Sequence, residues 1–311
     1  MNPSHSGQPF PLAADRGNAI ELEPYAIVAR WVAVSRLGSL RAPGSGFSIW
    51  IQLRGTSRLH AREGVFTLSP GEWLALDRDS APDIQTSRHG VMIGLVLAAE
   101  SSGCVRRSDT LPGRGRMHAR DLRIALRLWR HGMESSAAQD DLAARSLQSM
   151  LSHIAALQCD LDGNVSRCPG RSIRRKRQVF GRMQRARLFL EGHRHRVVRL
   201  TELADLTSFS SWYLSKTYHE IYDESPQAAS VRLRLEHACE LLQQTDWSIG
   251  EIGAACGFDN SCSFARAFRT RYGMTASAYR MAPRPCANLG TCTKPVAQGE
   301  HTTRNVTLSM R

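Results

Sequence analysis

Cysteine and histidine side chains are the residues of this 311-residue chain that can bind metals or form disulfides. The eight cysteines include no C-x-x-C pair and have no histidine at ligand spacing, which a zinc site would require. His60 and Glu63 lack a second histidine at H-x-H spacing, and His89 stands alone, so a metalloenzyme is an alternative without a motif. The sequence therefore predicts that the thiols are reduced and that Cys239 and Cys256 are packing residues. We expect the protein to bind no metal or cofactor and not to be an enzyme.

Arginine side chains, which can neutralise phosphate groups, supply most of the positive charge. Of the formal net charge of +13, residues 171–280 carry 18 Arg or Lys against 11 Asp or Glu, whereas residues 1–170 carry 19 against 16. Such a basic segment is the electrostatic footprint expected of a nucleic-acid binder. A solvated face also explains a charge run such as 171–177, so charge alone does not decide the function.

The length and composition exclude several classes of protein. The hydrophobic fraction is 42% and the aromatic fraction 7%, which allows ordinary cores, and the length suits two domains. No apolar run approaches the roughly 18–20 residues that span a bilayer, and residues 1–17 contain no apolar stretch of a secretory signal. We therefore expect a cytoplasmic protein that does not enter membranes.

The first half of the chain shows the pattern of a β-domain. Apolar segments at 46–54, 57–62, 64–68, 73–76 and 91–98 are separated by Gly and Pro turns, which favours a sandwich or barrel. Two amphipathic helices are expected within 120–157; they either pack on this domain or pair with a second subunit, and we favour a homodimer. We predict a flexible N-terminus at 1–19, a sensing or dimerisation domain at 20–161, a basic linker at 162–177 and a disordered tail at 282–311.

The helical segment 178–281 contains an internal repeat. Leu200, Leu203, Ala204 and Phe209 recur 49 positions later as Ile249, Ile252, Gly253 and Phe258. Each unit reads as a helix-turn-helix, at about 200–219 and 249–270, in which the small residue lets two helices approach closely. A plain helical bundle would explain the apolar spacing alone.

Helix and turn signals support this interpretation. Thr201 is expected to cap the first helix, and Ser248 with Glu251 forms a capping box. Gly257 suits a tight turn because it tolerates positive φ, and Ser208 at the equivalent position is a poorer match. Between the units, Pro226 begins a helix of about 19 residues, or about 28 Å. This is the right order to hold two recognition helices one DNA turn apart.

The segment 180–280 resembles the DNA-binding domain of AraC/XylS-type transcription regulators. The residues that carry the resemblance are Leu203-Ala204, Ser211-Trp212-Tyr213-Leu214, Ser225-Pro226, Arg232 to Ala238, Leu241-Leu242, Ile249, Ile252-Gly253, Cys256-Gly257-Phe258, Ser263-Phe264, Arg266, Phe268-Arg269 and Tyr279-Arg280. In that family the second helix of each unit enters the major groove of promoter DNA.

The resemblance implies the DNA-binding residues. These are Trp212, Ser215 and Lys216 in the first unit, and Ser261, Cys262, Ser263 and Arg266 in the second. Arg266 is the candidate for bidentate bonding to guanine, and Lys216 suits a base or a phosphate. Trp212 either contacts a thymine methyl group or is partly buried between helices. Cys262 departs from the longer polar residues common there in the family.

The N-terminal half resembles, more weakly, the cupin-like sensor domain of the same regulators. The residues are Leu53-Arg54-Gly55, Gly64 and Leu68 to Trp73. The resemblance implies a small-molecule effector or dimerisation; the candidate pocket residues are Trp50, His60, Phe66, Trp73 and His89.

The sequence thus predicts an α+β multidomain regulator, with a cupin-like β-barrel followed by two helix-turn-helix units joined by a long helix. We expect an activator that contacts RNA polymerase. The alternatives are an effector-independent regulator or a repressor, a cupin metalloenzyme fused to a DNA-binding domain, and a protein-interaction module.

Overall fold

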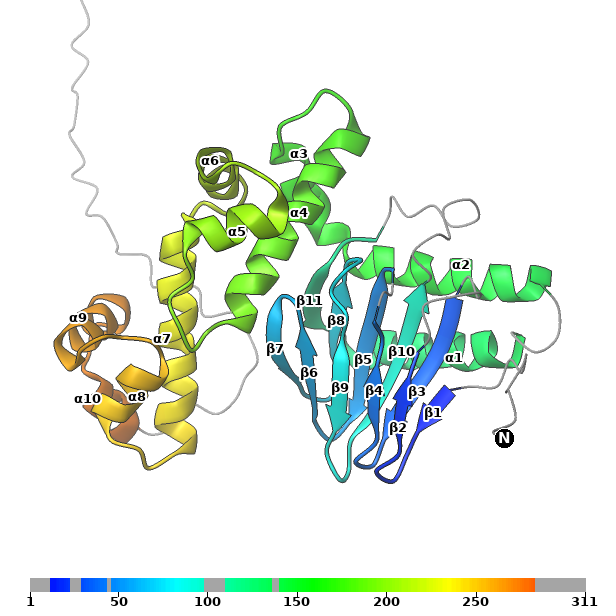
Figure 1. Ribbon diagram of the computed structural model, residues 1–311, viewed down its shortest axis with the longest axis horizontal. Helices are drawn as coiled ribbons and strands as arrows, with labels where there is room; N and C mark the ends of the chain where they lie inside the picture. Colours follow the sequence, from blue (N-terminus) through cyan, green and yellow to red (C-terminus); the bar gives the residue numbers. More distant parts are fainter. Residues whose placement is uncertain (1–11, 23–28, 44–45, 98–109, 136–139, 283–311) are drawn as a thin grey trace, which may run out of the picture.

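The computed structural model describes residues 12–22, 29–43, 46–97, 110–135 and 140–282. These residues form a mixed α+β structure in which the β-strands lie in the N-terminal half and a helical region follows (Figure 1). Among the described helices, none combines the length and apolar character that crossing a membrane requires.

Two stacked sheets form the N-terminal β-sandwich. The first sheet has the order β1-β3-β10-β5-β8-β11 and the second β2-β4-β9-β6-β7. β1 pairs with β3 and β2 with β4 in parallel, and the other pairs are antiparallel. The strand bounds are Leu12–Ala14 (β1), Ala19–Glu21 (β2), Ala29–Ser35 (β3), Ser39–Arg41 (β4), Ser48–Arg54 (β5), Ser57–Ala61 (β6), Gly64–Leu68 (β7), Glu72–Leu76 (β8), Asp83–Thr86 (β9), Val91–Leu97 (β10) and Gly113–Arg116 (β11).

The start of the sandwich corrects one expectation. Residues 1–19 were expected to be flexible, but Leu12–Ala14 pairs with Val32–Val34 and Ala14 is fully buried. Backbone pairing and burial fix this segment, and residues 1–11 lie outside the described residues.

Apolar side chains fill the space between the two sheets. Trp50 and Phe66 are buried there with Leu59, Leu74 and Met92. Gly94 lies opposite Trp50 in the ladder, and a Cβ atom at Gly94 would come within 2.4 Å of the Trp50 ring. The sandwich interior is therefore a packed core around the indole.

The expected closed barrel is not seen among the described strands. β11 and β7 end the two sheets and do not pair with each other. Helix α4 (Ile173–Gly192) packs against both of these edge strands, and its Leu188 is buried in the core between the sheets. A helix thus covers the edge that a barrel would close by hydrogen bonds.

Helices α1 (Ala119–Ser135) and α2 (Asp140–Leu157) cover the outer face of the first sheet. Trp129 and Ile154 are buried against Trp31 and Ile51, and the Trp129 Nε1 donates to the Gly94 carbonyl at 3.1 Å. These helices therefore pack on the β-domain, the first of the two arrangements considered. The homodimer, which was predicted from these apolar faces and from the family resemblance, therefore now depends on the resemblance.

The C-terminal half consists of short helices around two longer ones, α4 and α7. The bounds are Cys159–Leu161 (η1), Asp162–Arg167 (α3), Ile173–Gly192 (α4), Leu200–Thr207 (α5), Ser211–Tyr222 (α6), Pro226–Gln244 (α7), Ile249–Ala255 (α8), Ser261–Tyr272 (α9) and Ala276–Met281 (α10). The segment 162–177, expected to be a linker, is largely helical, because Ser172 caps α4 by accepting from the Arg175 backbone N–H. The expected tail lies outside the described residues from position 283 onward.

Candidate nucleic-acid interface

Two helix-turn-helix units form the helical region. In the first, α5 is followed by α6; in the second, α8 is followed by α9. The second helix of each unit begins after a residue with a capping side chain: Ser210 accepts from the Tyr213 N–H, and Asn260 accepts from the Ser263 N–H. Both caps satisfy free N–H groups of the first turn, so both helix starts are fixed by local sequence.

The first helices of the units have capping glutamates. Glu251 accepts from the Ser248 N–H at 2.7 Å, and the Ser248 hydroxyl accepts from the Glu251 N–H, which confirms the capping box. Thr201 was expected as a cap but lies inside α5, because the helix begins at Leu200. Glu202 instead caps the start of α5, because its carboxylate accepts a hydrogen bond from the Arg199 N–H at 2.8 Å.

The turns of the two units use the left-handed backbone conformation. Ser208 has φ +54° and Gly257 has φ +72°, and the two positions are 49 residues apart, as the repeat requires. A Cβ atom at Gly257 would lie 2.7 Å from the Arg196 Cα. Gly257 therefore allows both the left-handed turn and the close approach of the loop that precedes α5.

Small residues let the two helices of each unit pack closely. Ala204 is buried in the first unit. In the second, a Cβ atom at Gly253 would lie 3.2 Å from the Phe264 ring. Leu214 in α6 and Phe264 and Phe268 in α9 are fully buried, as expected for the anchors of the recognition helices.

Helix α7 joins the two units into one structure. Ser225 caps it and Pro226 is at its first helical position, as predicted. Its residues Ala229 and Leu233 belong to the core of the first unit, whereas Leu235, Ala238 and Leu242 belong to the core of the second. A single continuous helix thus has one half in each core (Figure 1).

The exposed face of α6 carries the predicted residues of the first unit. Trp212 is 70% exposed, so the alternative of partial burial is wrong. The Lys216 Nζ lies 5.3 Å from the centre of the Trp212 ring and 4.0 Å from a Glu220 carboxylate oxygen. Ser215 is half-buried on the same helix. Trp212 and Lys216 therefore present a cation and an aromatic face together.

The exposed face of α9 carries the predicted residues of the second unit. Ser261, Cys262, Ser263 and Arg266 are all exposed. The Ser263 hydroxyl donates to the Asn260 carbonyl at 2.8 Å, so it is engaged in the helix start. Arg266 makes no ion pair with another residue of the described part of the chain.

Sequence reasoning missed two exposed basic side chains on these helices. His219 lies three residues after Lys216, and Arg269 three residues after Arg266; both are exposed. Spacings of three and four residues place side chains on one helix face. This periodicity was the signal that would have added them to the predicted set.

Part of the basic run 171–177 is engaged within the protein. The Lys176 Nζ donates to the Ser166 carbonyl at 2.6 Å, and Arg175 donates to the Gln178 side chain at 2.9 Å. The run thus leads into the first turn of α4, and three of its arginines, Arg171, Arg174 and Arg175, are exposed.

Helix α4 also connects the first unit to the β-sandwich. The Arg185 Nε donates to the buried Glu63 carboxylate at 2.6 Å, and the Ser80 hydroxyl donates to the same oxygen at 2.9 Å. A Cβ atom at Gly64 would lie 2.6 Å from the Gly192 backbone. Glu63 was considered above as a metal ligand. In the structure it is buried and forms an ion pair that links the two halves of the chain.

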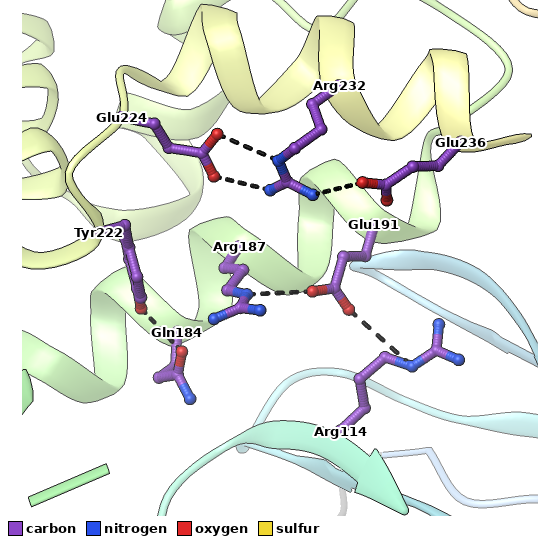
Figure 2. A network of polar contacts seen from close by, with 8 residues as sticks. All are labelled: Arg114, Gln184, Arg187, Glu191, Tyr222, Glu224, Arg232 and Glu236. Carbon is purple, nitrogen blue, oxygen red and sulfur yellow. Dashed lines mark hydrogen bonds and ion pairs between the residues drawn. The ribbon is translucent and has the colours of Figure 1, made fainter. Parts of the chain in front are cut away.

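A cavity of about 240 Å³ lies at this junction. Apolar side chains of Trp73, Leu157, Leu161 and Leu188 line it together with Arg114, Arg116, Gln184, Arg187 and Glu191. Figure 2 shows Glu191 between Arg187, at 3.1 Å, and Arg114, at 3.9 Å. Arg114 lies 3.9 Å from Glu72 as well, so neither of its pairs has the 2.7–2.9 Å of a strong charge-assisted bond.

Beside this cavity lie further polar contacts of α4, α6 and α7 (Figure 2). The Tyr222 hydroxyl donates to the Gln184 side chain at 2.7 Å. Arg232 donates to Glu224 at 2.6 Å and to Glu236 at 3.1 Å, and its hydrogen bond to Glu224 raises the pKa of its guanidinium. The Tyr222–Gln184 bond therefore joins α6 to α4, whereas the Arg232 pairs stay within α7 and the residues just before it.

The predicted pocket residues of the N-terminal half do not gather in one place. Trp50 and Phe66 belong to the core between the sheets, whereas His60 and His89 are exposed. Trp73 lines the junction cavity. In the described segments, no three or more His, Cys, Asp or Glu residues form a group that could hold a metal.

The comparisons with known proteins concern mainly the helical region. A family model described as a helix-turn-helix domain matches residues 203–282. The MmsAB operon regulatory protein of Pseudomonas aeruginosa is 33% identical over 92 residues, which cover 30% of this chain and 30% of that protein. The HTH-type transcriptional regulator ArgR of the same organism is 26% identical over 193 residues, covering 61% of this chain and 54% of that protein.

A solved structure matches the same region. It is the C-terminal domain of AraT, a response regulator from Geobacillus stearothermophilus, with 26% identity and a TM-score of 0.32; the match covers 35% of this chain and 91% of that one. The matched part of this chain spans about a third of the MmsAB regulatory protein and about half of ArgR. Residues 203–282 thus match an AraC-type helix-turn-helix domain, which confirms the resemblance of this region.

Proposed function

We propose that the protein is a transcription regulator that binds promoter DNA through α6 and α9. The observation that carries this proposal is the duplicated helix-turn-helix, whose second helices each expose cationic side chains, Lys216 in one and Arg266 in the other. The relatives named above are regulators. The division into a sensing or dimerisation domain and a DNA-binding domain is part of this proposal, and β1 and α4 extend the expected starts of the two domains to residues 12 and 173.

The exposed side chains divide into two chemical roles. Arg266 and Arg269 present guanidinium groups, which suit bidentate bonds to guanine O6 and N7. In α6, Lys216 and His219 lack the fixed pair of hydrogen-bond donors that a guanidinium has. Trp212 offers an apolar face to a thymine methyl group or sugar. We infer that α9 contributes more of the base readout and α6 more of the backbone contact.

Replacing Arg266 tests the assignment. Selection of duplexes from a random-sequence pool by the full-length protein would supply a binding site, and its affinity would be measured at several salt concentrations. Arg266→Ala should weaken binding by about 1–3 kcal/mol and relax the preference at one base pair. The nearby Ser277→Ala, outside the proposed interface, is the control. An Arg266→Ala protein with unchanged affinity and preference would contradict the role of this side chain.

We also propose that an effector binds in the junction cavity. Its apolar wall and its three arginines against one glutamate favour a small monocarboxylate with an apolar body. Such a ligand would compete with Glu191 for Arg114, whose two ion pairs are long. Because Leu188 and Glu191 belong to α4, binding there would act on the helix that precedes the first helix-turn-helix unit.

A ligand titration tests the cavity. Hexanoate, with uncharged hexanamide as the matched control, would be titrated while the Trp fluorescence and the melting temperature are followed. Hexanoate should stabilise the unaltered protein, and Arg114→Met should remove this effect while hexanamide has none. Equal stabilisation by both compounds would contradict an anion-binding site.

Other parts of the sequence prediction stay predictions. These are activation through RNA polymerase, a homodimer, a cytoplasmic location and the cupin-like kinship of the N-terminal sandwich. The proposed function contains no enzymatic step.

A further inference from the structure

One arginine in each helix-turn-helix unit contacts the turn from the preceding long helix. In the first unit, the Arg182 Nη1 of α4 donates to the Thr207 carbonyl at 3.3 Å, and its guanidinium carbon lies 5.0 Å from the centre of the Phe209 ring. The arginine therefore holds both the last carbonyl of α5 and the aromatic residue of the turn.

The second unit repeats this arrangement. The Arg234 Nη1 of α7 donates to the Gly257 carbonyl at 2.8 Å and to the Cys256 carbonyl at 3.4 Å. Its guanidinium carbon lies 4.3 Å from the centre of the Phe258 ring. Cys256 and Phe258 are the residues 49 positions after Thr207 and Phe209, so the two contacts are equivalent within the repeat.

The long helices themselves extend the repeat at a spacing of 52 residues. Arg182 corresponds to Arg234, and the buried residues Met183, Ala186 and Leu190 of α4 correspond to Leu235, Ala238 and Leu242 of α7. Each repeat unit is therefore a set of three helices, α4-α5-α6 and α7-α8-α9. The sequence repeat at 49 residues did not reveal this because the connections after α4 and α7 differ in length.

In each unit the turn phenylalanine also touches an aromatic residue of the recognition helix. The ring centres of Phe209 and Tyr213 are 4.9 Å apart, and those of Phe258 and Phe264 are 5.2 Å apart. A chain of contacts thus runs from the arginine through the turn to the helix proposed to enter the groove. The positive charge also lies at the C-terminal end of the first helix, where the helix dipole favours it.

We propose that Arg182 and Arg234 are positioning residues that fix the orientation of α6 and α9, so that each sets the affinity for one half of a two-part DNA site. This inference rests on the proposed DNA-binding function. The two arginine contacts differ in strength. Arg234 is buried and donates to two carbonyl groups, whereas Arg182 is half-buried and donates to one carbonyl group over a longer distance. Loss of Arg234 should therefore have the larger effect.

The test is a footprint of the full-length protein on a duplex that the unaltered protein selects from a random-sequence pool. Lys216→Ala and Arg266→Ala assign the two protected segments to α6 and α9. Arg182→Met should weaken overall binding roughly 10-fold and lose protection in the α6 segment. Arg234→Met should weaken it roughly 10- to 100-fold and lose the α9 segment, as expected for a lost hydrogen bond from a charged group.

Two further variants separate positioning from general stability. Arg232→Met removes an arginine of α7 that pairs with Glu224 and Glu236 and touches neither turn; it should keep both protected segments. Phe258→Leu keeps the arginine bonds but removes the stacked ring, and should weaken the α9 segment while circular dichroism shows an unchanged helix content.

The outcomes decide the inference. Equal loss of both segments in each arginine variant, or unchanged footprints in the arginine and Phe258 variants, would overturn it while leaving DNA binding intact. An unaltered protein that selects no sequence from the pool would overturn the proposed function, and the positioning role with it.

Discussion

The two helix-turn-helix units share one architecture, yet different neighbours hold them in place. The first shares α4 with the β-sandwich, through the Arg185–Glu63 ion pair and the buried Leu188. The second packs on α7 and on the loop before α5, where Gly257 meets Arg196. The duplication therefore provides two similar DNA-facing helices, of which the first is directly connected to the N-terminal half.

Truncating Leu188 should cause one of the largest losses of stability and should confine the loss to the surroundings of the first unit. Leu188→Ala leaves a cavity in the sandwich core and should lower the free energy of unfolding by about 2–5 kcal/mol. Leu242→Ala, which truncates a leucine in the core of the second unit, should cost a similar amount. Hydrogen exchange should locate the loss at the sandwich and α4 in the first variant and at α8 and α9 in the second. Identical exchange patterns would contradict the separate attachment of the two units.

The turn residues give the next largest difference. Gly257→Ala places a Cβ atom at φ +72° and 2.7 Å from the Arg196 Cα, and should cost roughly 2–4 kcal/mol. Ser208→Gly relieves the same left-handed conformation in the exposed turn of the first unit and should stabilise by up to about 1 kcal/mol. Urea unfolding would measure both. A neutral Gly257→Ala would mean that the loop can move away.

The sequence predicted local features well and distant partners poorly. The apolar segment 46–54 located a strand, and the Ser248–Glu251 spacing predicted a cap that the structure confirms. Glu63 and Arg185 are 122 residues apart, and no periodicity reveals such a pair. Charge also misled, since the run 171–177 suggested a linker although it begins a packed helix. In the same way, the apolar stripes of α1 and α2 showed that these faces are buried, but not against what.

The exposed side chains show the same limit. The family resemblance located Trp212 and Arg266 on the helices where the structure exposes them, but the positioning arginines were not predicted. Their function depends on which carbonyl lies opposite, and only the fold supplies that. For Trp212, sequence left burial and exposure equally open, because an aromatic residue at a helix start suits both.

The capping glutamates should give the smallest difference, and it depends on pH. The hydrogen bond from Arg196 lowers the pKa of Glu202, whereas hydrogen bonds from Ser248 lower that of Glu251. A carboxyl with a lowered pKa in the folded state stabilises the protein above its ordinary pKa of about 4.5 and loses this contribution as pH falls through the folded-state value. The unaltered protein should therefore lose stability below about pH 5.

Glu202→Gln should flatten this acid limb more than Glu251→Gln, because only Glu202 has a cationic partner, with Arg196 Nη2 at 2.7 Å. Melting temperatures between about pH 3 and pH 7 would measure the difference, since neutral glutamine cannot gain a proton. The Arg196→Gln variant should bring the acid sensitivity of the first cap down to that of the second. Equal flattening by the two glutamate variants would mean that the ion pair adds nothing to the cap. The first unit would then owe its distinct environment to α4 alone.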